Sequence, residues 1–594
     1  MIVDPSRRLQ SLYVPVGDGV RLAVDVWLPV ERTAVGGTVG TVMRVTRYHR
    51  AEAPREAGPE ADTSAAAGDL FNRAGFALVV ADARGTGASF GTRTGELGER
   101  EIKDYGELIS WVAAQSWSNG RVGVYGTSYE GQAAELIAGL GPAHLVAVAA
   151  LFSPYDPYRE LFYPGGCGTD GRFARWMYES QLKDGVIGAL DRLAAITGQP
   201  AETIALPSPV KPVDGPNGPT LLGSAIGEHQ SNTDVHALMG RVPFRDDRVA
   251  GLDWEATSPA ASGSTVVSSG VPMLVRAGWL DGGFAAGALA RFVTQASHQQ
   301  VEIGPWGHGG GSFADTLRPS GPEAAGTAEH DPLSPASQDR RLVEFFARYL
   351  ERNGKPRGPS TLTFGTLGTG AWQTVTSRPP AGTGTQRWYL GPMGQGSGLT
   401  REAGPAGTVT YRADVTASTG ATNRWLALDL GRAPAYPDRK HADDSLLIFT
   451  SGPLPADVHV LGFPVVTMRL ATSGTNGAVY VYLEDVDPDG DVSYLTEGCL
   501  RFLHRRTTGP AEPVRLGVPR TFARSDALRV VPGSPMDLTV PLLPVSAVVP
   551  AGHRVRVAMA GHDASCFTRY GPAEETFTLR LGRDSHLDLP VRYG

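Results

Sequence analysis

Three residues of this chain have types and positions that suit acyl-transfer chemistry, and the first is a serine. Ser128 lies in the motif YGTSYEG (125–131), between a β-type run at 122–125 and a helical stretch at 132–140 rich in Ala, Leu and Glu. A serine in a glycine-flanked turn between a strand and a helix is typical of a nucleophile elbow, whose strained backbone exposes Oγ. The amide of Tyr129 would then lie at a helix start, free to donate to a developing oxyanion.

The motif departs from the usual G-x-S-x-G spacing at one position. Glu130 stands where the second glycine is expected, and Gly131 follows it. In a chain with 75 glycines, a Gly-x-Ser with a nearby Gly also fits an ordinary strand-to-helix turn. The strand before the serine and the helix after it favour the elbow.

A nucleophilic serine needs a base and a carboxylate, and Asp281 and His308 are the candidates. Asp281 follows an apolar strand at 271–277, and His308 follows a strand at 300–303. Chemistry gathers where parallel strands end at their carboxyl side, and the chain order Ser, Asp, His is that of hydrolases with this elbow. We predict a Ser128–Asp281–His308 triad. The alternatives are that Asp281 only forms an Asp-Gly turn and that His308 is structural.

Strand and helix patterns alternate through the first part of the chain and again after residue 270. The segment between them is rich in aromatic residues, contains helical stretches such as 182–196, and is interpreted as a helical insertion. This alternation indicates an α/β fold with a mostly parallel sheet. The predicted core elements are a hairpin at 11–28, strands at 38–45, 76–81 and 145–152, and helices at 101–115, 284–296 and 338–350.

The chain changes character after a Gly- and Pro-rich linker at 353–359. From residue 360 onward short β-runs alternate with Gly, Pro and Asp turns, which is typical of an all-β sandwich, here a jelly roll. The predicted domains are the first part of the α/β core at 1–153, a helical cap at 154–265, the second part of the core at 266–357, and the jelly roll at 358–594.

Composition excludes several classes of partner. The net charge is −7 and no long basic run occurs, which argues against nucleic acid. No apolar run approaches the roughly 18 residues that span a bilayer, and no signal peptide is visible, so a cytoplasmic protein without a membrane partner is expected. The three cysteines suggest neither a disulfide framework nor a metal pair. The predicted chemistry needs no metal or organic cofactor, and a homo-oligomer remains open.

Several separated motifs together resemble those of the cocaine-esterase-type serine hydrolases, a family that includes X-Pro dipeptidyl-peptidases, α-amino-acid ester hydrolases and glutaryl-cephalosporin acylases. The resemblance covers nearly the whole chain and implies an α/β-hydrolase core, an inserted helical cap and a C-terminal jelly roll. The motifs are GDGVRLAVDVWLP (17–29), RYHR (47–50), DARGTGAS (82–89), YGTSYEG (125–131), GWLDGG (278–283), GPWGHGG (304–310), LPADVHVLGFPVV (454–466), EDVDPDG (484–490), LTEGCLRFLHR (495–505) and AGHRVRVAMAGHD (551–563).

The resemblance also implies roles for individual residues. Besides Ser128 as nucleophile, Asp281 as orienting acid and His308 as base, it implies that the Tyr48 hydroxyl binds the oxyanion beside the Tyr129 amide.

For the substrate pocket, the resemblance implies that Phe162 and Trp176 line it from the cap. Trp279, in the loop of Asp281, is also assigned to the pocket wall. Gly283 replaces an aromatic residue of the cocaine esterase pattern, so we predict room there for a bulkier substrate group.

The expected function is therefore a serine hydrolase that cleaves an ester or amide of a small acyl substrate through an acyl-enzyme. One alternative is an X-Pro dipeptidyl-peptidase or aminoacyl ester hydrolase, in which Glu160 or Asp170 would hold the α-amine. Another is an acyltransferase to an acceptor other than water. The β domain is expected to pack on the core, with carbohydrate binding as its alternative, and Asp82 and Arg84 are expected to pair locally.

Overall fold

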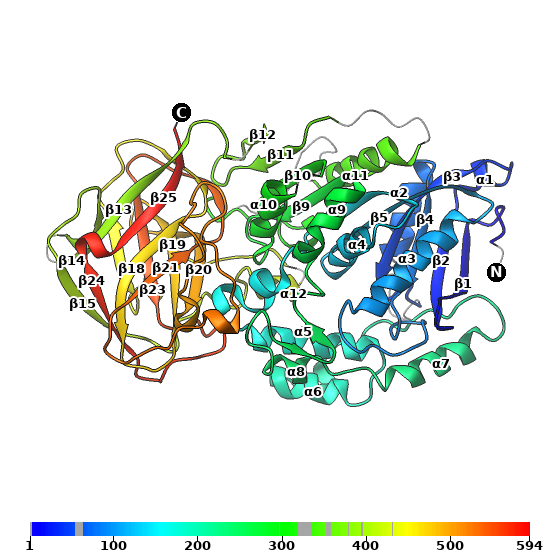
Figure 1. Cartoon of the computed structure of the whole chain (residues 1–594), viewed down its shortest axis with the longest axis horizontal. Helices are drawn as coiled ribbons and strands as arrows, with labels where there is room; N and C mark the ends of the chain where they lie inside the picture. The colour runs from blue at the N-terminus through cyan, green and yellow to red at the C-terminus, as the bar shows by residue number, and fades with distance from the viewer. Residues whose placement is uncertain are drawn as a thin grey trace.

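The computed structural model describes residues 3–53, 63–295, 297–318, 334–351, 358–377, 379–393, 396–430 and 432–593. They form an α/β part, which contains the N-terminus, and an all-β part, which contains the C-terminus (Figure 1). The predicted linker at 353–359 lies, up to residue 357, outside the described residues. No described helix is long and apolar enough to cross a membrane.

The core is a ten-stranded sheet, as far as the described residues show. Seven consecutive strands, from β4 to β11, run parallel, and antiparallel strands extend both edges. β4 and β9 are buried along their whole length, which explains their uninterrupted apolar sequences. In spatial order the strands are β1 (Leu9–Pro15), β2 (Arg21–Trp27), β4 (Ala77–Asp82), β3 (Val39–Thr46), β5 (Ser118–Thr127), β6 (Leu145–Leu151), β9 (Met273–Gly278), β10 (Gln299–Gly304), β11 (Thr361–Gly365) and β12 (Trp372–Val375).

Helices cover both faces of this sheet. Buried residues of α3 (Glu99–Ala113), α4 (Tyr129–Leu140) and α10 (Phe284–Thr294) belong to one hydrophobic cluster. Those of α2 (Thr63–Arg73) and α11 (Pro335–Leu350) belong to a second cluster. The predicted α/β-hydrolase core is thereby confirmed.

Asp82 and Arg84, at the end of β4 and in the loop after it, have polar partners in the α/β part, as predicted. Asp82 accepts hydrogen bonds from the backbone amides of Arg50 and Ala88, and Arg84 forms an ion pair of 2.6 Å with Asp104.

The segment between β6 and β9 is mostly helical. The single helical stretch expected at 182–196 is wrong: Gly185 and Gly188, with φ of 73° and 79°, separate two helices. Left-handed backbone ends a helix, and glycine adopts it without a steric penalty. The elements are η1 (Tyr158–Phe162), η2 (Pro164–Gly166), α5 (Asp170–Lys183), α6 (Ala189–Thr197), η3 (Ala201–Thr203), α7 (Gly218–His229), α8 (His236–Met239), β7 (Arg248–Val249), β8 (Leu252–Asp253), η4 (Pro259–Ser262) and α9 (Gly263–Ser269).

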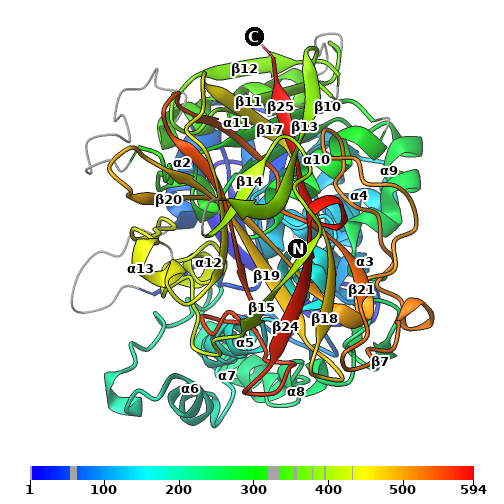
Figure 2. The same ribbon diagram turned by 90° about the vertical axis from the view of Figure 1, so that its left-hand side faces the viewer.

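The all-β part is a sandwich of thirteen described strands that pair antiparallel except for β14 with β16. Figure 2 views it from the side away from the core, where β15, β24, β18 and β21 run side by side. Two short helices, α12 (Ala427–Leu430) and α13 (Lys440–Asp443), interrupt it. The strands are β13 (Thr383–Met393), β14 (Gly396–Thr400), β15 (Gly407–Arg412), β16 (Leu447–Ser451), β17 (Val458–Gly462), β18 (Val465–Thr472), β19 (Ala478–Val486), β20 (Val492–Arg501), β21 (Met536–Pro541), β22 (Val545–Val549), β23 (Arg554–Ala560), β24 (Thr576–Leu581) and β25 (His586–Arg592).

Two strands that follow residue 358, the predicted start of the β domain, join the sheet of the core. β11 pairs parallel to β10 and β12 pairs with β11, so both strands extend the core sheet. The second sheet begins at β13. A short β-run looks the same in sequence whichever sheet it joins, because the pairing partner is chosen by distant parts of the chain.

Candidate active site

The turn between β5 and α4 holds Ser128 in a strained conformation. Its φ is 61° and its ψ −123°, outside the regions that side-chain-bearing residues normally adopt. The two glycines are needed because other atoms come close: a Cβ on Gly131 would lie 2.8 Å from the carbonyl oxygen of Gly126, and one on Gly126 would collide with Glu130. The sequence therefore keeps glycine where the backbone is crowded, and the Glu130 side chain lines the cavity described below.

The residue after the serine fixes the start of α4. Tyr129 is the first residue of the helix, so its amide has no acceptor within that helix. Its buried phenol donates to Glu101 and accepts a hydrogen bond of 3.0 Å from Arg93. These contacts anchor the helix start, and with it the direction of the amide beside Ser128.

Asp281 and His308 follow the neighbouring parallel strands β9 and β10. Nδ1 of His308 lies 2.9 Å and 3.1 Å from the two carboxylate oxygens of Asp281. Asp281 is only 1% exposed, whereas the His308 side chain is 17% exposed. The pair thus has its carboxylate in the interior and its imidazole at the edge of a cavity.

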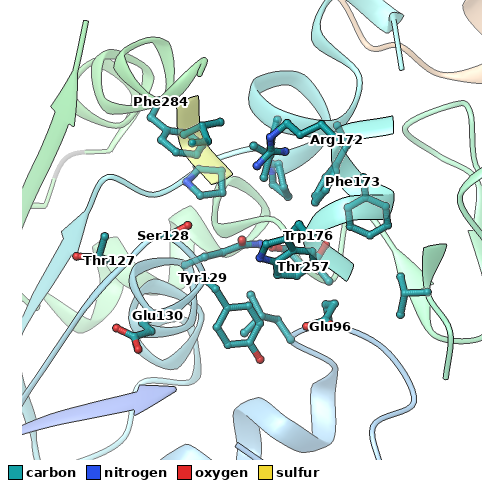
Figure 3. A pocket seen from close by; sticks show the side chains of 18 of the residues that line it. Glu96, Thr127, Ser128, Tyr129, Glu130, Arg172, Phe173, Trp176, Thr257 and Phe284 are labelled. Carbon is teal, nitrogen blue, oxygen red and sulfur yellow. The ribbon is translucent and has the colours of Figure 1, made fainter. Parts of the chain in front are cut away.

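Ser128 and His308 line the same cavity of about 390 Å³. Figure 3 shows Ser128 beside Thr127 and Tyr129, with Phe284 and Arg172 on the opposite side and Phe173 and Trp176 from the cap. Most of the wall is apolar. The other lining residues are Tyr48, Glu96, Leu97, Glu130, Gln132, Pro154, Pro157, Leu161, Phe162, Glu179, Val235, Leu252, Trp254, Thr257 and Leu428.

Tyr48 lines this cavity, and its hydroxyl contacts a residue of the cap. Nε1 of Trp176 donates a hydrogen bond of 3.1 Å to Tyr48 Oη. Burial raises the pKa of Tyr48 well above its usual value, so the phenol stays protonated. Because Oη accepts from the indole, its own proton is left to donate elsewhere.

Comparison with known proteins places this arrangement in a family. The model of X-Pro dipeptidyl-peptidase (S15 family) matches residues 18–310, and that of the X-Pro dipeptidyl-peptidase C-terminal non-catalytic domain matches residues 353–587. The chain is 34% identical to a Mycobacterium bovis protein that is provisionally named a serine esterase. The match covers 98% of this chain and 95% of that protein. The chain belongs to the cocaine-esterase and X-Pro dipeptidyl-peptidase family of serine hydrolases.

Two further relatives are less similar in sequence. The cocaine esterase of Rhodococcus sp. is 26% identical, with 94% of this chain and 91% of that protein covered. The crystal structure of a CocE/NonD family hydrolase from Staphylococcus aureus superposes with a TM-score of 0.68 at 16% identity, covering 98% of this chain and 93% of that one. At this identity the superposition supports the fold only.

Two residues that we predicted to line the pocket, Trp279 and Gly283, lie elsewhere. Trp279 is buried behind the Asp281 loop and donates a hydrogen bond of 2.6 Å to the Gly365 carbonyl in β11. Gly283 donates to the Glu160 carbonyl at 3.0 Å, and a Cβ there would lie 2.8 Å from Glu160 backbone atoms. Neither lines the cavity. The space that we expected Gly283 to leave for substrate is filled by η1.

This packing gives a stability prediction. Gly283→Ala should lower the free energy of unfolding by about 1–3 kcal/mol, the usual cost of overpacking, because the new methyl group meets backbone that cannot easily move. Chemical denaturation measures the change. Gly223→Ala in α7 is the matched control, since a Cβ there meets nothing within 4 Å. If the Gly283→Ala variant is as stable as the wild type and has an altered preference for large over small esters, Gly283 lines the pocket after all.

Two residues of the β part contribute to the candidate active site, and neither was predicted from the sequence. Leu428, next to the start of α12, lines the cavity. Arg424, which is almost fully buried, donates to the carbonyls of Gly282 at 2.9 Å and Trp279 at 2.5 Å and so holds the Asp281 loop. Phe284 was also missed; its ring centre lies 5.8 Å from that of His308. The only feature of the sequence that could have predicted a role for Phe284 is its position three residues after Asp281.

Acidic groups in the cavity are close to arginines. Glu96 lies 2.5 Å from Arg47, Glu179 lies 2.8 Å from Arg175, and Glu130 lies 4.0 Å from Arg44.

The two acids considered for holding an α-amine do not line the cavity. The carboxylate of Glu160 accepts from the amides of Tyr155 and Asp156, both at 2.9 Å, and Asp170 accepts from Thr568 at 2.7 Å.

Proposed function

We propose that this chain is an esterase that hydrolyses esters of small, largely apolar carboxylic acids through an acyl-enzyme on Ser128. One observation carries the proposal: a serine on a strained turn and an imidazole bound to a buried carboxylate face the same apolar cavity. The combination of nucleophile, base and orienting acid is the arrangement that serine hydrolases use on several unrelated folds.

The mechanism has two acyl-transfer steps. His308 takes the proton of Ser128 as Oγ attacks the ester carbonyl, while Asp281 holds the imidazole tautomer and stabilises the imidazolium. His308 then protonates the departing alcohol, leaving the acyl group on Ser128. Water, activated by the same imidazole, attacks the acyl-enzyme and releases the acid.

In this mechanism two donors stabilise the negative charge that forms on the carbonyl oxygen. These are the Tyr129 amide at the start of α4 and the Tyr48 hydroxyl. The Tyr48 oxygen accepts a hydrogen bond from Trp176 Nε1, so its proton can be donated to the substrate. Fixed donors of this kind stabilise the transition state more than the ground state, because the charge develops only on the way to it.

We expect Tyr48→Phe to lower kcat by roughly 10²–10³-fold with little change in KM, the loss seen when one oxyanion donor is removed. Steady-state kinetics on p-nitrophenyl butyrate measures both constants. Tyr155→Phe is the control, because it removes a buried phenol that contacts Gln295 and does not line the cavity. A nearly normal kcat for Tyr48→Phe would show that the Tyr48 hydroxyl does not bind the oxyanion and that Tyr48 only packs in the site.

The choice of ester over aminoacyl substrate rests on the charges around the cavity. A free α-amine needs a carboxylate, and the described acids that line the cavity lie within ion-pair distance of arginines. We therefore expect p-nitrophenyl esters to be hydrolysed with a higher kcat/KM than aminoacyl or X-Pro p-nitroanilides. Assays with and without a serine-reactive phosphonate, and with an added alcohol as acceptor, test this. Faster turnover of X-Pro p-nitroanilides would favour the peptidase. Formation of esters of the added alcohol would favour the acyltransferase.

A further inference from the structure

A second cavity, of about 180 Å³, lies where the cap, the core and the β part meet. Its wall is mainly apolar and includes Ala286 and Ala290 of α10 and Trp425, Tyr480 and Phe567 of the β part. It is separate from the first cavity, although η1 borders both: Leu161 and Phe162 line the first, and Arg159 and Glu160 line the second.

Arg520 is the unusual member of this second cavity. It is only 4% exposed, and its guanidinium donates to the carbonyls of His504, at 3.0 Å, and Thr539. Among the described residues no carboxylate lies within 4.0 Å of it. Burial, followed by the nearby Arg159, lowers the pKa of Arg520 to about 10, so it is still a cation at neutral pH. Buried charges in proteins are normally paired, and this one faces a cavity instead.

The other ionisable acids and arginines that line this cavity are Arg159, Glu160 and Glu497. Arg159 lies 3.1 Å from Asp156, and its side chain is 41% exposed. Burial raises the pKa of Glu160 to about 8 and that of Glu497 to about 7. Oε1 of Glu497 accepts from Trp425, and within the described residues its Oε2 has no hydrogen-bond partner. Because burial favours the neutral form of both carboxyl groups, neither is a full counter-charge for Arg520 at neutral pH.

We propose that this second cavity is a binding site for a small carboxylate with an apolar body, whose carboxylate pairs with Arg520. The carboxylate of the ligand would be the counter-ion that the described residues do not provide, held by charge-assisted hydrogen bonds. The aromatic wall suits an apolar body, and the volume limits its size: a cavity of about 150 Å³ holds benzene, so about six carbons fit here. An aliphatic acid such as hexanoate has both features.

Calorimetric titration of the full chain with sodium hexanoate tests the proposal, with hexanamide as the uncharged control. We expect hexanoate to bind at least about tenfold more tightly, since hydrogen bonds to charged groups are worth more than neutral ones. Ala290→Leu, which fills the cavity without altering a charge, should weaken hexanoate binding by at least tenfold. Equal binding of acid and amide would overturn the proposal.

Two arginine variants separate the role of Arg520 from general stability. Arg520→Met should weaken hexanoate binding at least tenfold. Arg505→Met should leave it unchanged, because Arg505 also donates to backbone carbonyls but does not line the cavity. If Arg520→Met does not fold, the titrations of Ala290→Leu with hexanoate and of the wild type with hexanamide still test the proposal. Hexanoate binding that survives Ala290→Leu would show that the acid binds outside the second cavity and would refute the proposal.

Discussion

Ser128→Ala should lower kcat for p-nitrophenyl esters by about 10⁶-fold, the usual loss when the nucleophile of a Ser-His-Asp triad is removed. The methyl group of alanine cannot form an acyl bond, and the donors that remain provide only a small residual rate. Because the Ser128 side chain lines a cavity and is not packed in the core, the variant should unfold at nearly the wild-type temperature.

Mass spectrometry after fluorophosphonate treatment gives an independent measurement. The adduct should appear on Ser128 in the wild type and disappear in Ser128→Ala. Thr127→Ala is the matched control, since Thr127 precedes the serine and lines the same cavity. Its Ser128 should still be labelled. An adduct on another serine, or substantial turnover by Ser128→Ala, would refute the assignment of the nucleophile.

Asp281→Asn should lower kcat by about 10⁴-fold with little loss of stability, as for the equivalent change in serine proteases. The carboxylate accepts from His308 Nδ1, which leaves Nε2 free to take the serine proton. An asparagine amide can instead donate to Nδ1, and the imidazole then carries its proton on Nε2 and cannot act as the base. The rate of fluorophosphonate labelling should fall together with kcat.

The chain contains a matched control for this experiment. Asp485 and His553 form a second Asp–His pair in the β part, with Nδ1 at 2.9 Å and 3.0 Å from the carboxylate oxygens. The Asp485–His553 pair does not line the Ser128 cavity. Asp485→Asn should therefore leave kcat close to that of the wild type, although Asp485 is also buried. Comparable losses from both substitutions would mean that Asp281 acts through stability and not through the imidazole.

Local patterns were sufficient to predict the framework of the site. The apolar runs at β4 and β9 and the glycine-flanked turn around Ser128 depend on neighbours within a few residues, so sequence spacing reports on them directly. Asp281 and His308 were predicted to lie close together because parallel strands end at one edge of a sheet, and the structure places them 2.9 Å apart. Tyr48, Phe162 and Trp176 were assigned to the pocket by family resemblance, and all three line it.

The sequence alone therefore determined the α/β order, the elbow and the candidate catalytic residues, whereas the tertiary structure decided what surrounds them. Gly283 was expected to leave space for substrate, but the Glu160 backbone fills that space. Arg424 and Leu428 reach the site from the β part, more than a hundred residues along the chain from His308. Such contacts depend on how separate elements pack, and packing is a property of many residues at once. A residue's own neighbours in sequence therefore carry no signal for them.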